Sequence, residues 1–191
     1  MKKPVDSREM SSVQGKRSID QSELPSEGVV SLLMAETQTI EDGSLIKVGK
    51  YRHFEVFSDE LPRSGGTDLH PQPLTYICMG IGFWLLTQLA RFAKMMKIEI
   101  RKASCKVEME YFREGSVLKG TVHSRWTQVR SFLSFDSDSH EERLSLLIKN
   151  AKGGCHAESL VKYPVPIHSE VVVNGKKFKF PQSWNILETY L

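Results

Sequence analysis

Hydrophobic residues are most concentrated in one stretch of the chain, from Pro73 to Lys97. Its first part, Leu74 to Ala90, carries no charged side chain, and its apolar residues recur at steps of three and four, which places them on one face of a helix. The opposite face is also apolar in its first half, for example at Phe83. The pattern therefore predicts a buried core helix whose N-terminal half is covered on all sides.

A membrane span is the competing interpretation of this stretch, because a span needs about 20 predominantly apolar residues. The charge-free run is slightly shorter and is interrupted by small residues and by residues with polar groups: Tyr76, Gly80, Gly82, Thr87 and Gln88. The chain has no second run of this kind, and its first residues are polar, unlike the apolar segment of a secretory signal. We therefore expect a cytoplasmic protein that has no membrane partner.

Strand-like patterns flank this helix on both sides. Before it, short apolar runs separated by turn residues predict an antiparallel sheet of three strands: 29–40, 45–48 and 54–57. After it, the period drops to two and predicts a second antiparallel meander of three strands: 105–111, 117–126 and 129–135. Antiparallel strands on either side of a long helix indicate an α+β fold.

The rest of the chain predicts two further helices and a hairpin. Residues 139–142, Ser-His-Glu-Glu, have the spacing of a capping box ahead of an amphipathic helix that ends at Gly153 and Gly154. Residues 155–161 form a short helix before Pro164, and residues 170–180 form a closing hairpin around an Asn-Gly turn. We expect one domain at 29–191.

The first 28 residues are polar and show no sustained apolar period. They are interpreted either as a disordered arm or as a segment that orders on a partner subunit.

Composition changes this picture little. The chain has 191 residues, 40% hydrophobic and 26% charged, which is ordinary for one globular domain. A net charge of +3, with scattered Lys and Arg, does not predict nucleic-acid binding. The chain has only three cysteines, Cys78, Cys105 and Cys155, and an odd number cannot all pair within one chain, so they do not suit a secreted disulfide framework. They favour cytosolic thiols, with a redox or catalytic role open for one or two of them.

Cys155 is the strongest candidate for reactivity. It follows a Gly-Gly break and begins the short predicted helix, where the helix dipole favours a thiolate, and His156 beside it adds to this when charged. The alternative is a free cysteine that fills a tight corner of the core. Cys78 lies near the start of the long helix but on its apolar face, so core packing is the favoured interpretation there. Cys105 is in phase with buried strand positions, and no role is predicted for it.

Other kinds of site find no support in the sequence. The six histidines show no metal-ligand spacing, and neither a nucleophile elbow nor a phosphate-binding loop is present. We therefore predict no metal and no cofactor.

Three stretches carry a family resemblance: the loop G-G-T-D-L-H-P-Q-P-L-T-Y at 65–76, the long helix leading into K-I-E-I at 97–100, and G-G-C-H-A-E-S-L-V-K-Y-P-V-P-I at 153–167. Together they resemble the OsmC/Ohr family of osmotically induced and organic-hydroperoxide-resistance proteins. The resemblance covers about residues 29–175.

The resemblance implies an α+β fold built as an intertwined homodimer, with the two central helices between sheets. In this family a peroxidatic cysteine on the central helix attacks a hydroperoxide, and a resolving cysteine after the next long helix then closes a disulfide. An Arg and a Glu orient the first thiolate. A dithiol, such as a lipoyl carrier, restores the thiols.

Carried onto this chain, the resemblance places Cys155 at the resolving position and Trp84 at the peroxidatic position. Cys78 lies six residues before Trp84, about 9 Å along a helix. Thr75, with Gln72 nearby, stands where the family has its Glu, and Arg52 is a loose substitute for its Arg. Trp has no nucleophile and Thr holds no charge, so each departure weakens the family mechanism.

Two hypotheses follow. The first is a divergent thiol peroxidase acting on organic hydroperoxides through Cys155, with Cys78 as its second catalytic candidate. The second is a binding module that performs no chemistry and in which Trp84, Phe83 and Tyr76 line a pocket for a small apolar or aromatic ligand.

Overall fold

The computed structural model describes residues 31–163 and 165–179. The predicted N-terminal arm, 1–28, and the end of the chain after 179 lie outside the described residues. The described elements follow in this order: β1 (Glu36–Thr39), β2 (Lys47–Tyr51), β3 (Phe54–Ser58), the short 3-10 helix η2 (Pro62–Ser64), α2 (Pro73–Met95), β4 (Arg101–Glu114), β5 (His123–Asp136), α3 (Glu141–Gly153), α4 (His156–Lys162), β6 (Val172–Val173) and β7 (Lys176–Lys177). The predicted α+β class is confirmed.

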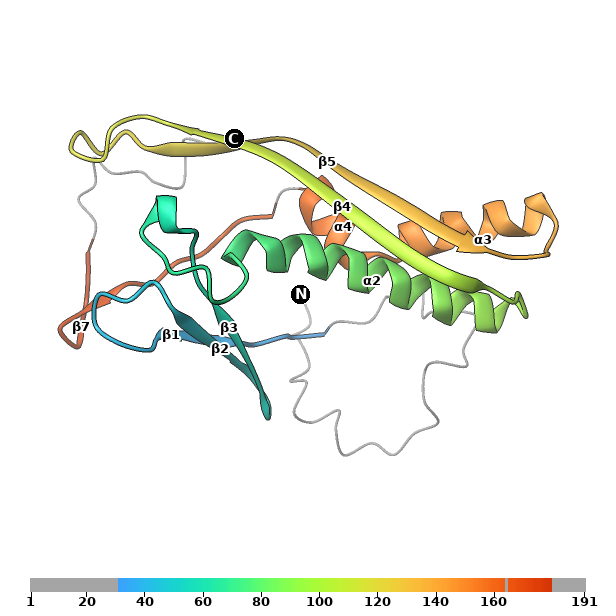
Figure 1. Cartoon of the computed structure of the whole chain (residues 1–191), viewed down its shortest axis with the longest axis horizontal. Coiled ribbons are helices and arrows are strands. Elements are labelled where there is room, and N and C mark those ends of the chain that lie inside the picture. The colour runs from blue at the N-terminus through green and yellow to red at the C-terminus, as the bar shows by residue number, and fades with distance from the viewer. Residues whose placement is uncertain (1–30, 164, 180–191) are drawn as a thin grey trace, which may run out of the picture.

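Helix α2 is the centre of the arrangement. The long hairpin of β4 and β5 crosses one side of α2, and α3 and α4 pack against the same helix (Figure 1). The buried residues of α2 recur at helical steps: Ile81, Gly82, Leu85, Gln88, Leu89 and Ala93. Leu85 and Leu89 pack with Leu147 and Ala151 of α3 in the main core cluster. The apolar stripe that predicted α2 is therefore the face that forms this core.

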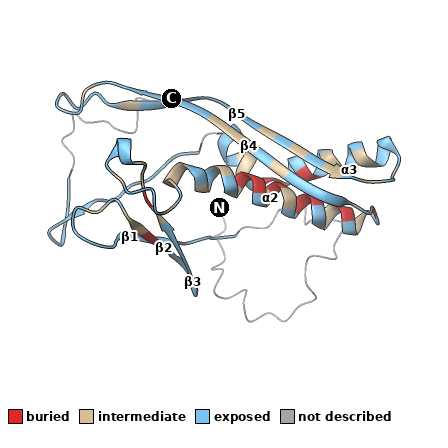
Figure 2. Ribbon diagram, viewed as in Figure 1, coloured by how far each residue is buried: buried red, intermediate tan, exposed pale blue. Residues whose placement is uncertain are grey.

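The N-terminal half of α2 is not covered on all sides. Ile77 is 45% exposed and Phe83 is 67% exposed, and buried residues concentrate in the C-terminal half of the helix (Figure 2). The expectation of complete cover is wrong for the described part of one chain, because the β1–β2–β3 sheet lies only near the start of α2 (Figure 1). Of the described residues, α2 alone has the length and apolar composition to cross a bilayer, a test that the core helix of a soluble protein also passes.

The predicted three-stranded second meander is also wrong. It is a hairpin of two long antiparallel strands, and the segment predicted to open its middle strand, 117–120, lies in the connecting turn. Glu110 pairs with Gln128 whereas Tyr111 pairs with Trp126, so Thr127 has no partner and forms a β-bulge. The bulge interrupts the alternation along β5, which explains why the pattern suggested two strands in place of one.

The strands predicted at 45–48 and 54–57 agree with the structure within a few residues, but the strand predicted at 29–40 is much shorter: β1 begins only at Glu36, and residues 31–35 form no strand. Strands β1, β2 and β3 form an antiparallel sheet in chain order, and β6 and β7 form the closing hairpin. Asn174 and Gly175 make its turn with φ angles of 51° and 73°, as an Asn-Gly hairpin turn requires.

Helix α3 forms as predicted, but its capping box does not. The N-cap is His140, which makes no side-chain cap bond, so Ser139 lies one position too early. Gly154 ends the helix as expected.

Candidate functional site

The junction between α3 and α4, residues 154–156, faces α2. The indole Nε1–H of Trp84 donates to the carbonyl oxygen of Gly154 at 3.2 Å, and Nε2 of the buried Gln88 donates to the same oxygen at 2.9 Å. The Trp84 and His156 rings lie 5.4 Å apart between centroids. The helix position that the resemblance assigns to the peroxidatic cysteine therefore lies against the segment that holds Cys155.

Cys155 is a buried N-cap. Its side chain is 1% exposed and belongs to the core cluster with Leu85 and Leu147. Its Sγ accepts a hydrogen bond from the backbone N–H of Glu158 at 3.5 Å. The predicted short helix is confirmed, with Cys155 just before its first residue.

Cys78 lies on α2 in a different environment. Its thiol is half-buried, and burial raises its pKa above the usual value. Among the described residues, Cys78 belongs neither to the core cluster of Cys155 nor to the side chains packed on it. All three cysteines are free thiols.

Cys105, for which no role was predicted, is the cysteine that packs against the cluster of Cys155. Strand β4 packs on α2 here: a Cβ on Gly82 would be in ordinary van der Waals contact with Cys105, 3.9 Å from its Cβ. Burial is the largest cause that raises the pKa of the Cys105 thiol; the negative charge of Glu158 raises it further, whereas Lys152 lowers it. The one sequence signal for this placement was the phase of Cys105 along the strand.

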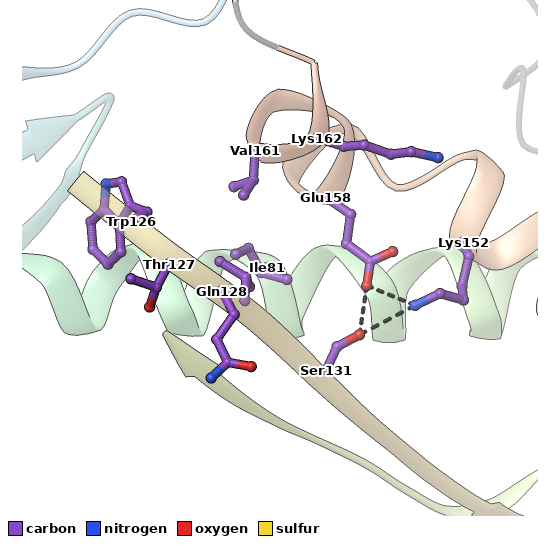
Figure 3. Close-up of a pocket in the computed structure, with 10 residues that line it drawn as sticks. Ile81, Trp126, Thr127, Gln128, Ser131, Lys152, Glu158, Val161 and Lys162 are labelled. Atoms are coloured by element: carbon purple, nitrogen blue, oxygen red, sulfur yellow. Dashed lines mark hydrogen bonds and ion pairs between the residues drawn. The ribbon is translucent and has the colours of Figure 1, made fainter. Parts of the chain in front are cut away.

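A polar cluster is formed by Ser131, Lys152 and Glu158 (Figure 3), and the backbone N–H of Glu158 is the group that donates to Sγ of Cys155. The hydroxyl of Ser131 donates to Oε1 of Glu158 at 2.7 Å, and Nζ of Lys152 lies 2.9 Å from the same oxygen and 3.2 Å from Oγ of Ser131. The three side chains come from β5, α3 and α4. Sequence reasoning missed this cluster because no local motif joins its members.

The polar cluster forms one wall of an open groove with a volume of about 430 Å³. The rest of the lining is Ile81 of α2, Trp126, Thr127, Gln128 and Val129 of β5, and Val161 and Lys162 of α4 (Figure 3). Trp84, Phe83 and Tyr76 are not among its lining residues. Apolar and polar groups therefore share this groove, as is common in small-molecule sites.

The remaining predicted site residues serve local structure. The Thr75 hydroxyl donates to the carbonyl of Gln72, the N-cap of α2, and the Tyr76 hydroxyl donates to the carbonyl of Phe57 in β3. Arg52 lies in the turn between β2 and β3 with φ 56°, and this hairpin extends away from α4 (Figure 1).

The loop before α2 is organised by Asp59, whose side chain is fully buried. Its Oδ2 accepts hydrogen bonds from the Thr67 hydroxyl at 2.6 Å and from the N–H groups of Thr67 and Leu69 at 3.0 and 3.2 Å. The Thr67 hydroxyl is the main cause of a lowered Asp59 pKa, and burial opposes it. Gly66 is required here because a Cβ would lie 1.9 Å from the carbonyl oxygen of Glu60.

No metal site accompanies these groups. Within residues 31–163 and 165–179, no three His, Cys, Asp or Glu side chains are grouped so that they could hold a metal ion.

The chain has an α+β fold in which the long helix α2 packs against the segment that holds Cys155. The sequence resemblance implied this arrangement within one chain. The family described as OsmC-like protein matches residues 65–170, which is more than half of the chain. The chain therefore belongs to the OsmC family.

Solved structures agree with this assignment. An OsmC-like protein from Mycoplasma pneumoniae is 16% identical, with 69% of this chain and 88% of that chain covered and a TM-score of 0.56. An OsmC-like protein of unknown function from Vibrio cholerae is 10% identical, with 68% and 93% covered and a TM-score of 0.54. An OsmC-like hydroperoxide resistance protein from Jannaschia sp. CCS1 is 18% identical, with 69% and 85% covered and a TM-score of 0.51. These likenesses show the OsmC-like fold. No curated protein matches the sequence.

Proposed function

We propose that this OsmC-like protein reduces organic hydroperoxides through cysteine thiols, with Cys155 as one of the two thiols involved. Family membership supports the proposal, as does the name of the Jannaschia neighbour, a hydroperoxide resistance protein. The overall reaction converts a hydroperoxide and two thiols into an alcohol, water and a disulfide. A dithiol reductant, such as a lipoyl carrier, then restores the two thiols.

The observation that carries the proposal is the contact between Trp84 and the carbonyl of Gly154, next to Cys155. It brings together the two positions at which the family places its thiols. One of these positions still holds a thiol, and the other holds an indole, which cannot attack a peroxide. The second thiol must therefore come from elsewhere in the chain, either from Cys78 or from Cys105.

Peroxide consumption by the reduced full-length protein tests the proposal. The protein is mixed with cumene hydroperoxide and dihydrolipoamide, and the remaining peroxide is followed over time for wild type and for Cys155→Ala. We expect the variant to lose at least about 90% of the rate, because neither a disulfide nor its reduction is possible without Cys155. An unchanged rate in a folded Cys155→Ala protein would exclude Cys155 from the reaction, and no consumption by the wild type would exclude the peroxidase function.

Ligand binding is the second candidate, favoured by the groove beside the polar cluster. Its apolar lining, including Ile81 and Trp126, suits a small apolar or aromatic ligand, and the polar cluster provides an orienting end. Native mass spectrometry of the purified protein and a thermal-shift screen of aromatic acids and alcohols test this function. A bound species lost in Trp126→Ala would support it, and no binding in either experiment would argue against it.

We further propose that the protein is a cytoplasmic homodimer. The apolar residues that α2 exposes in one chain support the dimer, since a partner subunit is the cover that the family resemblance implies. Three free cysteines support a reducing compartment.

A further inference from the structure

We propose that Cys105 and Cys155 are the redox pair of this protein and form a reversible disulfide with each other. The inference deepens the proposed hydroperoxide reduction and rests on it for the oxidant. In this pairing Cys105 of β4, which lies next to Gly82 of α2, takes the role of the thiol that is missing at the Trp84 position.

Two hydrogen bonds and the register of the β4–β5 hairpin place the two thiols in one region. Sγ of Cys155 accepts the N–H of Glu158, whose carboxylate accepts the hydroxyl of Ser131. Ser131 pairs with Val107, and Leu133 pairs with Cys105, so Ser131 and Cys105 are diagonal neighbours on one face of the hairpin. Both thiols therefore belong to the same small region between the hairpin, α2 and α4.

The surroundings of the two thiols agree with this placement. Cys105 packs on the cluster that contains Cys155. After burial, the carboxylate of Glu158, whose backbone N–H donates to Sγ of Cys155, is the next cause that raises the pKa of the Cys105 thiol. Cys78 is not part of that cluster among the described residues, and its pKa is raised by burial alone. Cys105 is thus better placed than Cys78 to meet Cys155.

Exposure sets the order of the steps. Cys105 is partly exposed whereas Cys155 is 1% exposed, so a peroxide reaches Cys105 first. The Cys105 sulfur attacks the terminal peroxide oxygen; an S–O bond forms, the O–O bond breaks, and the alcohol leaves with the thiol proton. The Cys155 sulfur then attacks the Cys105 sulfur, the S–O bond breaks, and water leaves with the Cys155 proton. The two sulfurs give up two electrons in total, which reduce one hydroperoxide.

Disulfide mapping of the full-length protein tests the pairing with two oxidants. One arm uses diamide, which oxidises thiols without any peroxide chemistry, and the other uses cumene hydroperoxide. After free thiols are alkylated, proteolysis and mass spectrometry identify the linked peptides. Cys105→Ser, Cys155→Ala and the matched control Cys78→Ser are compared, and circular dichroism selects the folded variants.

We expect a Cys105–Cys155 peptide from wild type and from Cys78→Ser, and at least a tenfold loss of linked peptide in the other two variants. A Cys78–Cys155 link, or a link that persists in Cys105→Ser, overturns the pairing. The two proposals fail separately. If diamide forms the Cys105–Cys155 link but the protein consumes no peroxide, the pairing is supported and the peroxidase function is excluded. If Cys105→Ser still consumes peroxide, the peroxidase function is supported and the Cys105–Cys155 pairing is excluded.

Discussion

Trp84 is the residue at which the family resemblance predicts the largest departure from a two-cysteine peroxidase. Its indole is held by the carbonyl of Gly154 and lies against His156, so it fills the space on α2 that faces Cys155. Gln88 holds the same carbonyl from one helical turn further along. The site is therefore rigidly arranged around a side chain that has no redox chemistry of its own.

Trp84→Cys is expected to return a peroxidatic thiol to this helix position. Peroxide consumption with a dithiol reductant should rise at least tenfold, and oxidation should link position 84 to Cys155. The substitution also removes a large core side chain, which costs about 3–5 kcal/mol of stability. Trp84→Ser is the control, because it leaves a similar cavity without a thiol. Equal rates in the two folded variants would contradict the register that places Trp84 opposite Cys155.

Glu158 is expected to control the reactivity of Cys105. Burial is the largest cause that raises the pKa of this thiol; in addition, the negative charge of Glu158 raises it and the positive charge of Lys152 lowers it. Glu158→Gln removes one of the charges that disfavour the thiolate, so alkylation of Cys105 by iodoacetamide should begin at lower pH than in wild type. Lys152→Gln should move the same profile to higher pH. Mass spectrometry of the Cys105 peptide across a pH series measures both.

Glu36→Gln, on the separate β1–β2–β3 sheet, is the control for these two variants. It should leave the alkylation profile of Cys105 unchanged. A shift in the same direction for Glu158→Gln and Lys152→Gln would show that packing, and not charge, governs this thiol.

At the scale of elements, local patterns identified most of the fold. The apolar stripe of α2 and the Asn-Gly turn at Asn174 each depend on residues close together in sequence, and the structure contains both. The bulge at Thr127 depends on how two strands pair, which the alternation along one strand cannot show. The prediction that the N-terminal half of α2 is covered on all sides failed for a similar reason, because cover depends on which other elements pack on the helix.

Some features of the candidate site could be predicted from the sequence, and others could be seen only in the structure. The resemblance assigned Trp84 and Cys155 to the two thiol positions of the family, and only the structure shows that Trp84 donates a hydrogen bond to the carbonyl of Gly154, beside Cys155. The polar cluster and the approach of Cys105 arise where β5, α3 and α4 meet, and no spacing along the chain encodes such a meeting. Three-dimensional contact was needed to distinguish Cys105 from Cys78.

The loop before α2 is expected to depend on the ionised Asp59. Its pKa is lowered in the folded state, so its stabilising effect is present above the unfolded pKa of about 3.9 and is lost as the pH falls through the lower folded value. Asp59→Asn should lower the melting temperature by several degrees at neutral pH. The amide is uncharged, so its oxygen accepts the three hydrogen bonds more weakly than the carboxylate does. The substitution should also remove part of the acid sensitivity below pH 4.

Melting temperatures between pH 7 and 2, followed by circular dichroism, measure both effects. Asp68→Asn, in the same loop but exposed, is the matched control and should follow the wild-type curve. If Asp59→Asn melts at the wild-type temperature across the series, the carboxylate does not hold this loop.

At the scale of the whole molecule, one chain leaves large apolar side chains uncovered on two elements that surround the site. Phe83 on α2 is 67% exposed and Leu160 on α4 is 62% exposed. The exposed Phe83 lies between the buried residues Gly82 and Leu85, so it is on a face of α2 that the core does not cover. Exposed apolar groups grouped in this way are typical of a surface that another protein covers.

In the proposed homodimer this surface is the interface. Phe83 is its most exposed aromatic helix residue among the described residues, so its ring would be buried on association. Light scattering after gel filtration should give about twice the 21.7 kDa of one chain. Phe83→Glu should weaken the dimer by at least about 2 kcal/mol, or roughly 30-fold in Kd, because it places a charge in an apolar contact. Leu118→Glu is the control: Leu118 is 99% exposed in the β4–β5 turn, and its charge should leave the mass unchanged. A monomeric wild type, or a Phe83→Glu protein that stays dimeric at micromolar concentration, would mean that this face of α2 has another role.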